Sequence, residues 1–174
     1  SSRLCCGNMT ESSQILKILL IVSGTVLSLL IGISVLKPEL IEGDPVPFVL
    51  EHCIGGHTEA LESHYHPSVM VIIDGEQIPI PTDVGVQTGC MRMVHTHDDS
   101  GKLHVEKEDA SINITIGDFF AVWGKTFTEN QILDSNTDST HEIVMTVDGV
   151  VNTEYNNYIP TDGEQIKIEY KEIN

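Results

Sequence analysis

The segment "SVMVIIDGEQIPIP", residues 68–81, decides the fold because it predicts a β-hairpin. Asp74-Gly75 is a favoured two-residue hairpin turn, and β-branched or other apolar residues lie on both sides of it. A chain of 174 residues has room for one domain and an appendage. We therefore expect a single domain that contains this hairpin.

Further short strands are expected after the hairpin. The segment "KLHVE", residues 102–106, alternates between apolar and polar residues, and "HEIVMTVDGVV", residues 141–151, predicts a strand and a turn. The closing segment "GEQIKIEY", residues 163–170, also alternates. Side chains two positions apart in a strand point the same way. The apolar residues of this segment therefore share one face: Ile166, Ile168 and Tyr170.

One segment differs from these strands. The stretch "ITIGDFFAVWGKTF", residues 114–127, holds several aromatic residues with a glycine on each side. We expect a short helix over residues 117–123 that packs its aromatic face on the sheet. The order of segments resembles a β-grasp-like or small β-sandwich plan. Residues 48–174 are therefore predicted to form a mainly β domain with one short helix.

The N-terminal region predicts a membrane anchor. Residues 18–36, "ILLIVSGTVLSLLIGISVL", carry no charge. At about 1.5 Å per residue they can cross a hydrocarbon core about 30 Å thick. We expect a tail over 1–12, a transmembrane helix within 13–37 and a linker over 38–47. A cleaved signal peptide is the alternative, but its apolar core is usually shorter and no clear cleavage site follows the run.

The charges around the apolar run predict its orientation. Arg3 and Lys17 precede it, which favours a cytoplasmic N-terminus and a single-pass protein of the cell membrane with its C-terminal domain extracytoplasmic. The formal net charge is −17: residues 1–40 carry +1, and the residues after 40 carry −18. Such a domain repels nucleic acid and attracts cations, so we expect no nucleic-acid partner. The expected partners are the membrane, through residues 18–36, and other membrane-protein subunits.

Four cysteines fall into two pairs. Cys5 and Cys6 precede the apolar run, on the side predicted to be cytoplasmic. Cys53 and Cys90 lie in the outer domain, where an oxidising compartment would favour a disulfide between them. Each also lies near a group of histidines, so a thiolate that binds a metal ion is the competing interpretation.

Histidines are concentrated in two short segments. "SHYHPS", residues 63–68, and "MRMVHTHDDSGKLHVE", residues 91–106, hold three pairs of metal-ligand residues spaced by two positions. In a strand, each pair would lie on one face. Imidazole and carboxylate groups are ligands for divalent transition metals. If the two segments lie together, the pairs converge on one metal site with these candidate ligands: His64, His66, His95, His97, His104 and Glu106.

Residues near these pairs are weaker candidates for a metal site. Asp98 could accept a hydrogen bond from the ring of a ligand histidine, as a second-shell residue, or it could belong to the turn that "DDSG" predicts. His52, His57 and His141 lie outside the pairs, so we expect them to be ordinary surface or core residues.

Three motifs together resemble a little-characterised group of membrane-anchored archaeal and bacterial proteins. The stretches are "HYHPSVMVIIDGEQIPIPTDVGV", "HTHDDSGKLHVE" and "ITIGDFFAVWG". The outer domains of that group carry H-x-H, then H-T-H-D-x-x-G-x-x-H-x-E, then a segment of glycine, aromatic residues, tryptophan and glycine. The similarity covers about residues 50 to 170. It implies a metal site at the matching residues but no particular reaction, and the copper demand of the archaeal ammonia oxidisers in the group makes copper plausible.

Several metalloprotein classes lack their motifs in this sequence. The blue-copper Cys-x₄-His-x₄-Met run, the cupin pattern, H-E-x-x-H and C-x-x-C-H are all missing. We therefore expect a membrane-anchored extracytoplasmic protein that binds copper or zinc, as a metallochaperone, a metal sensor or a subunit of a membrane assembly. The alternative is a mononuclear metalloenzyme with a His/carboxylate site, for which Glu106, Asp98 and Tyr65 are the nearby acid–base candidates.

Overall fold

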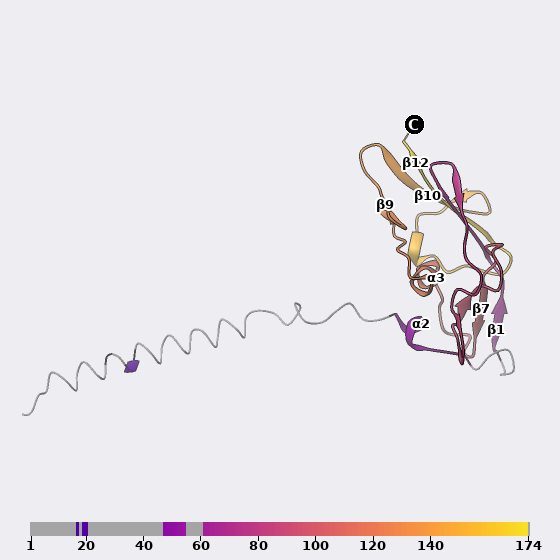
Figure 1. The fold of residues 1–174 in the computed structure, drawn as a ribbon, viewed down its shortest axis with the longest axis horizontal. Helices are drawn as coiled ribbons and strands as arrows, with labels where there is room; N and C mark the ends of the chain where they lie inside the picture. The colour runs from indigo at the N-terminus through magenta and orange to yellow at the C-terminus, as the bar shows by residue number, and fades with distance from the viewer. Residues whose placement is uncertain (1–16, 18, 21–46, 55–60, 174) are drawn as a thin grey trace, which may run out of the picture. The chain divides into compact units, whose positions relative to one another are not determined.

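Figure 1 shows the computed structural model of the chain. It describes residues 17, 19, 20, 47–54 and 61–173. The chain divides into two units, and the second, Val46–Asn174, contains the predicted domain.

The predicted membrane anchor cannot be compared with the structure. Apart from Leu19 and Leu20, residues 18–36 lie outside the described part of the chain, as does the predicted tail over 1–12. Of the predicted linker over 38–47, only Pro47 is described. Among the described residues, no helix is both long enough and apolar enough to cross a membrane.

A mixed five-stranded sheet is the largest element of the domain (Figure 1). Its strand order is β11-β10-β12-β2-β3, and β12 runs parallel to β2 while the other neighbours are antiparallel. The bounds are β2 Ser68–Ile73, β3 Glu76–Ile78, β10 His141–Val147, β11 Val150–Val151 and β12 Gln165–Glu172. The closing strand therefore lies in the middle of the sheet, between two hairpins.

Both hairpins turn through an Asp-Gly pair in left-handed backbone conformation. Asp74 and Gly75 have φ of 50° and 84°, and Asp148 and Gly149 have φ of 49° and 81°. Two residues of positive φ make the primed turn whose twist suits a two-residue hairpin. The hairpin predicted around Asp74-Gly75 is thus confirmed, as is the strand and turn predicted over residues 141–151.

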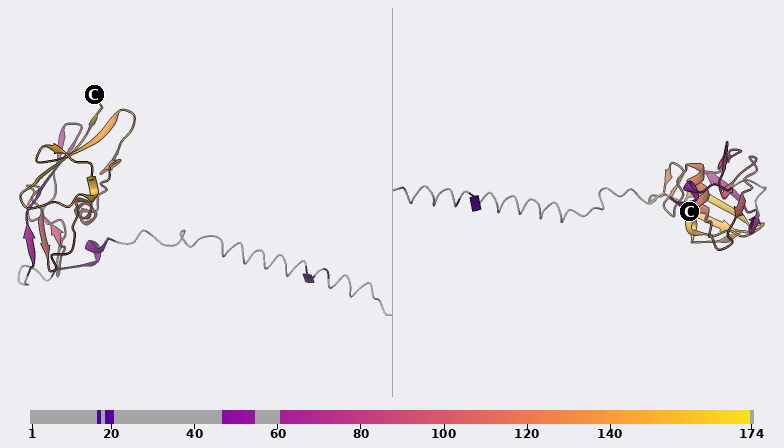
Figure 2. Two further views of the ribbon diagram at one scale, coloured as in Figure 1. Left: turned by 180° about the vertical axis from the view of Figure 1, so that it is seen from behind. Right: turned by 90° about the horizontal axis from the view of Figure 1, so that it is seen from below.

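A second, antiparallel sheet of three short strands has the order β1-β7-β6. Its members are β1 Ser63–Tyr65, β6 Val94–His95 and β7 His104–Lys107. In Figures 1 and 2, β1 and β7 lie at one end of the domain, and the C-terminal end of the chain lies at the other.

The segment before β7 ties this sheet to the larger one. Leu103 N donates to Pro67 O at 2.8 Å, and Val69 N donates to Gly101 O at 2.8 Å. Gly101 has φ of 80°, and a Cβ there would collide with the carbonyl oxygen of Val69. A glycine is therefore required where this segment crosses β2.

The helix α3, Ile116–Trp123, confirms the short helix predicted over 117–123. Thr115 and Asp118 form a capping box at its start, and Gly124 ends it with φ of 70°. Ile116, Phe119 and Phe120 are buried. They belong to one hydrophobic core with the inner side chains of the five-stranded sheet, which include the predicted Ile166, Ile168 and Tyr170.

The described residues form a mainly β domain with few helices. The remaining elements are short: α2 Phe48–Glu51, β4 Val86–Gln87, β5 Cys90–Met91, β8 Gln131–Ile132, β9 Ser135–Asn136 and the 3₁₀ turn η2 Tyr155–Asn157. Strands β4 and β5 pair with each other, and so do β8 and β9.

Candidate metal centre

The three-stranded sheet brings the histidine pairs together. In its register His95 lies opposite His104, and His64 lies opposite Glu106. His66 and His97 lie just beyond the ends of β1 and β6, two positions after His64 and His95. Because residues two apart share a face, the predicted pairs point to a common region beside β7.

His104 lies in the middle of the five rings. Its ring centroid is 4.6 Å from that of His66 and 4.6 Å from that of His97. The rings of His95 and His64 follow at 5.4 Å and 5.9 Å. The central strand β7 thus supplies the ring that contacts the histidines from both of its neighbours.

The ring nitrogens form two groups of three. His64, His66 and His104 make one, which we call the β1 group, and His95, His97 and His104 make the other, the β6 group. Within each group the ligand atoms lie within 4.8 Å of one another. His95 is buried, whereas His64 and His97 are exposed, so the centre extends from the protein interior to the surface.

His95 is held in one tautomer. Its side chain is 0% exposed, and its Nδ1 lies 2.9 Å from the carbonyl oxygen of Arg92. A carbonyl can only accept, so Nδ1 carries a proton, and in the neutral ring Nε2 keeps its lone pair. Nε2 lies 3.2 Å from Nε2 of His97. A backbone carbonyl behind a histidine ring is the usual support of a metal ligand.

Thr96 fixes the segment between the two histidines of the β6 group. Its side chain is fully buried, its Oγ1 donates to Pro81 O at 2.9 Å, and Val84 N donates to it at 3.1 Å. The middle residue of H-T-H therefore anchors the backbone, while its two neighbours face the centre.

Gly85 allows the closest packing behind the β6 group. It has φ of 78°, and a Cβ there would lie 2.8 Å from Val122 Cγ1, 2.9 Å from Val94 O and 3.2 Å from His95 Cβ. Contacts that short are repulsive, so a larger residue would push β6 or α3 away.

Glu106, a predicted ligand, lies outside both groups of three. Its side chain is 0% exposed, and Oε1 lies 3.3 Å from Nε2 of His64. A buried carboxylate at this distance orients the imidazole of His64. Its role as a direct ligand stays a prediction.

Asp98 lies in the turn that follows the β6 group. Its Oδ1 accepts hydrogen bonds from the Ser100 hydroxyl and, at 2.9 Å, from the Ser100 backbone N–H. The hydroxyl of Ser100 is the main reason that the pKa of Asp98 lies below its usual range. This is the turn that "DDSG" predicts, and the second-shell role of Asp98 stays a prediction.

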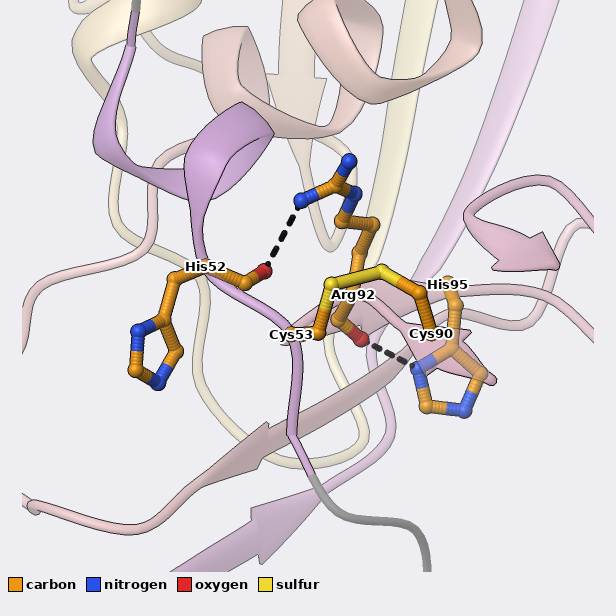
Figure 3. Close-up of a disulfide and its surroundings, with 5 residues drawn as sticks. All are labelled: His52, Cys53, Cys90, Arg92 and His95. Carbon is orange, nitrogen blue, oxygen red and sulfur yellow. Dashed lines mark hydrogen bonds between the residues drawn. A yellow bond between two sulfur atoms is a disulfide. The ribbon is translucent and has the colours of Figure 1, made fainter. Parts of the chain in front are cut away.

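The predicted disulfide between Cys53 and Cys90 is present, with an S–S distance of 1.96 Å. Both sulfur atoms are therefore used, and the thiolate interpretation is wrong for this structure. Figure 3 shows that the disulfide lies beside Arg92, whose Nη1 donates to His52 O at 3.1 Å. The carbonyl of the same arginine accepts the hydrogen bond from His95 (Figure 3). Arg92 thus links the disulfide region to the β6 group.

Two of the three histidines that were not predicted as ligands are described, and both make contacts outside the two groups. His52 Nε2 lies 3.5 Å from a carboxylate oxygen of Glu108. His141 stacks on Tyr170 with a centroid distance of 5.0 Å and lies beside Asp138. His57 lies outside the described residues.

Sequence reasoning missed Arg92, Thr96 and Gly85. Each of them contacts β6 or the segment next to it rather than supplying a ligand atom to either group of three. One signal could have drawn attention to Arg92: it is the only arginine in the acidic domain.

No family model, curated protein or solved structure gives a significant match to this chain. The resemblance drawn from its motifs therefore stays a prediction, and the candidate centre is argued from its own geometry.

Proposed function

We propose that the domain binds a transition-metal ion, copper or zinc, through its clustered imidazoles. The observation that carries this proposal is the convergence of five histidine rings from the region of three neighbouring strands around His104. Imidazole is a ligand that copper and zinc both accept. The 3.2 Å between Nε2 of His95 and Nε2 of His97 suits two ligands of one ion with bonds of about 2.0–2.1 Å.

The proposed setting is a membrane-anchored, extracytoplasmic protein that acts as a metallochaperone, a metal sensor or a subunit of a membrane assembly. The apolar run over residues 18–36 supports the anchor and makes the membrane a proposed partner, together with other membrane-protein subunits. The Cys53–Cys90 disulfide supports an oxidising compartment. The net charge of −17 would raise the local concentration of cations.

A mononuclear metalloenzyme is the second candidate. Each group supplies three imidazoles and reaches the surface, which would leave one position of an ion open to a substrate. The nearby acid–base groups favour an enzyme less than a metal-binding protein. Burial raises the pKa of Tyr65, which keeps it protonated, and Asp98 is held by Ser100. Glu106 is the remaining candidate, and it contacts His64.

The sequence left two plans open for the fold, β-grasp-like and small β-sandwich, and we propose the β-grasp-like one. The hairpin β2–β3, the helix α3, the hairpin β10–β11 and the closing strand β12 follow one another along the chain. The central parallel pair of β12 and β2 supports this plan, because a closing strand between two hairpins completes a single sheet.

Metal binding can be tested on the full chain in detergent. Protein purified without added metal should contain copper or zinc, and the metal-free protein should bind Zn(II) in calorimetric titration. A variant with all five clustered histidines replaced by alanine should not bind, whereas His141→Ala should bind like the wild type. Far-UV circular dichroism checks that the variants fold. Unchanged tight binding by the folded five-histidine variant would refute the proposal.

A further inference from the structure

Given the metal binding proposed above, we infer that the centre holds two metal ions, one in the β1 group and one in the β6 group, bridged by the ring of His104. The starting observation is that the ligand atoms form two groups of three that share this one residue. The shared ring belongs to β7, and the other members come from strands on its two sides.

The spacing of the strands favours two positions over one. Neighbouring strands of a sheet lie about 4.8 Å apart, so β1 and β6 are separated by about 10 Å with β7 between them. An ion about 2.1 Å from a ring nitrogen of one histidine therefore lies near the rings on the same side of β7. The ring of His104, with centroids at 4.6 Å to both His66 and His97, is the group within reach from either side.

The chemistry of imidazole allows His104 to serve both ions. The ring has two nitrogens on different edges, and a neutral ring has a lone pair on one and a proton on the other. When the second ion binds, that proton passes to solvent and a metal–nitrogen bond replaces the N–H bond. The ring then carries one negative charge and joins two ions about 6 Å apart, given two bonds of about 2.1 Å on opposite edges.

The two positions are not equivalent, so the ions should bind in order. In the β6 group, His95 is buried, its tautomer is fixed by Arg92, and its Nε2 is already 3.2 Å from that of His97. A preformed site loses less conformational freedom on binding, so the first ion should enter here and stay. This resident ion would be the tighter of the two.

The β1 group should take the second, more exchangeable ion. The His64 side chain is 39% exposed, so this position is open to solvent and to a partner that delivers or accepts metal. The buried carboxylate of Glu106, 3.3 Å from His64 Nε2, supplies negative charge beside this group. A fixed ion beside an exchangeable one suits a protein that passes metal on.

Stoichiometry tests the inference. In calorimetric titration of the metal-free full chain in detergent, Zn(II) should bind in two steps, one ion per step. The double variant His64→Ala/His66→Ala should lose the weaker step and keep the tighter one. The double variant His95→Ala/His97→Ala should lose the tighter step and keep one ion. Glu106→Gln should weaken only the second step, by about 10–100-fold.

Electron paramagnetic resonance tests the bridge. With one Cu(II) per chain, the integrated signal should equal the copper content. With two, it should fall well below the copper content, because a bridging imidazolate couples the two electron spins antiferromagnetically. The variant His64→Ala/His66→Ala, which keeps one copper, should give its full signal. A full signal from two coppers in the wild type would overturn the bridge.

The outcomes separate the two proposals. One ion per chain, lost in either double variant, would overturn the two-ion centre and leave the proposed metal binding intact. Binding that survives replacement of all five histidines would overturn both. Since His95 is buried and its replacement could unfold β6, the single variant His97→Ala is the alternative on that side, and it should weaken the tighter step alone.

Discussion

The two sheets of this domain use their strands for different purposes. In the five-stranded sheet, β10 and β12 pair continuously from His141 with Glu172 to Val147 with Ile166, and alternate side chains fill the core. In the three-stranded sheet, β6 pairs with β7 through only two residues, Val94 and His95. On one face of that sheet the side chains are imidazoles and a carboxylate.

The difference shows how a small domain can stabilise polar clusters. The long sheet buries apolar surface, which stabilises the fold, since a fully buried aliphatic side chain contributes about 1.5–3 kcal/mol. The short sheet has less apolar surface to bury. Besides its buried Val94 and Val105, particular contacts hold the segments next to it: the disulfide at β5, the hydrogen bonds of Arg92 and Thr96, and the close packing at Gly85.

The largest expected effect lies in the long sheet. Ile168 is 0% exposed in the central strand β12, so Ile168→Ala should lower the free energy of unfolding by about 2–5 kcal/mol through lost burial and a cavity. Metal stoichiometry should not change while the protein is folded. Chemical denaturation followed by the fluorescence of Trp123, the one tryptophan, measures this. Ile173→Ala, at a site 52% exposed, is the matched control and should cost little.

Removal of the disulfide tests the short sheet. Cys53→Ser with Cys90→Ser frees a loop closed across 37 positions and should destabilise the domain by about 2–4 kcal/mol. Since Arg92 lies between the disulfide and His95, zinc affinity at the β6 group should also fall. Thermal unfolding and zinc titration measure the two effects. The control pair Cys5→Ser and Cys6→Ser should change neither stability nor zinc affinity. A disulfide variant with wild-type zinc affinity would show that the disulfide does not support the candidate centre.

A smaller effect is expected at Gly85, where the chain offers a close control. Gly85 and Gly89 both have φ of 78°, but a Cβ at Gly89 would meet nothing within 4 Å. Both alanine variants therefore carry the same backbone strain, and only Gly85→Ala adds the collision with Val122 and β6. We expect it to be about 1–3 kcal/mol less stable than Gly89→Ala and to bind zinc more weakly. Equal stability of the two variants would mean that β6 is not tightly packed.

The sequence predicted the parts of the fold that local rules determine. The Asp-Gly turn, the alternation of Ile166, Ile168 and Tyr170, and the glycine-flanked aromatic helix all depend on neighbouring residues, and the structure has each of them. The pairing of β12 with β2 could not be derived in this way. It joins segments about a hundred residues apart, and the choice of neighbour depends on the whole sheet.

The candidate centre was predicted as a set of residues but not as an arrangement. The i, i+2 spacing correctly grouped His64 with His66 and His95 with His97. It could not show that β7 lies between β1 and β6, and so it could not show that His104 is shared. The position of Glu106 behind His64 depends on strand register, which a single sequence does not reveal.

The buried hydroxyl of Thr96 has a consequence for how this sequence can evolve. In the H-T-H segment, the middle side chain bonds Pro81 and Val84, while the outer two face the centre. Substitutions at the middle position would be selected through folding, and those at the outer positions through the proposed metal binding. Because the two kinds of selection act on alternate residues, ligands could be exchanged, and metal preference changed, without loss of the scaffold.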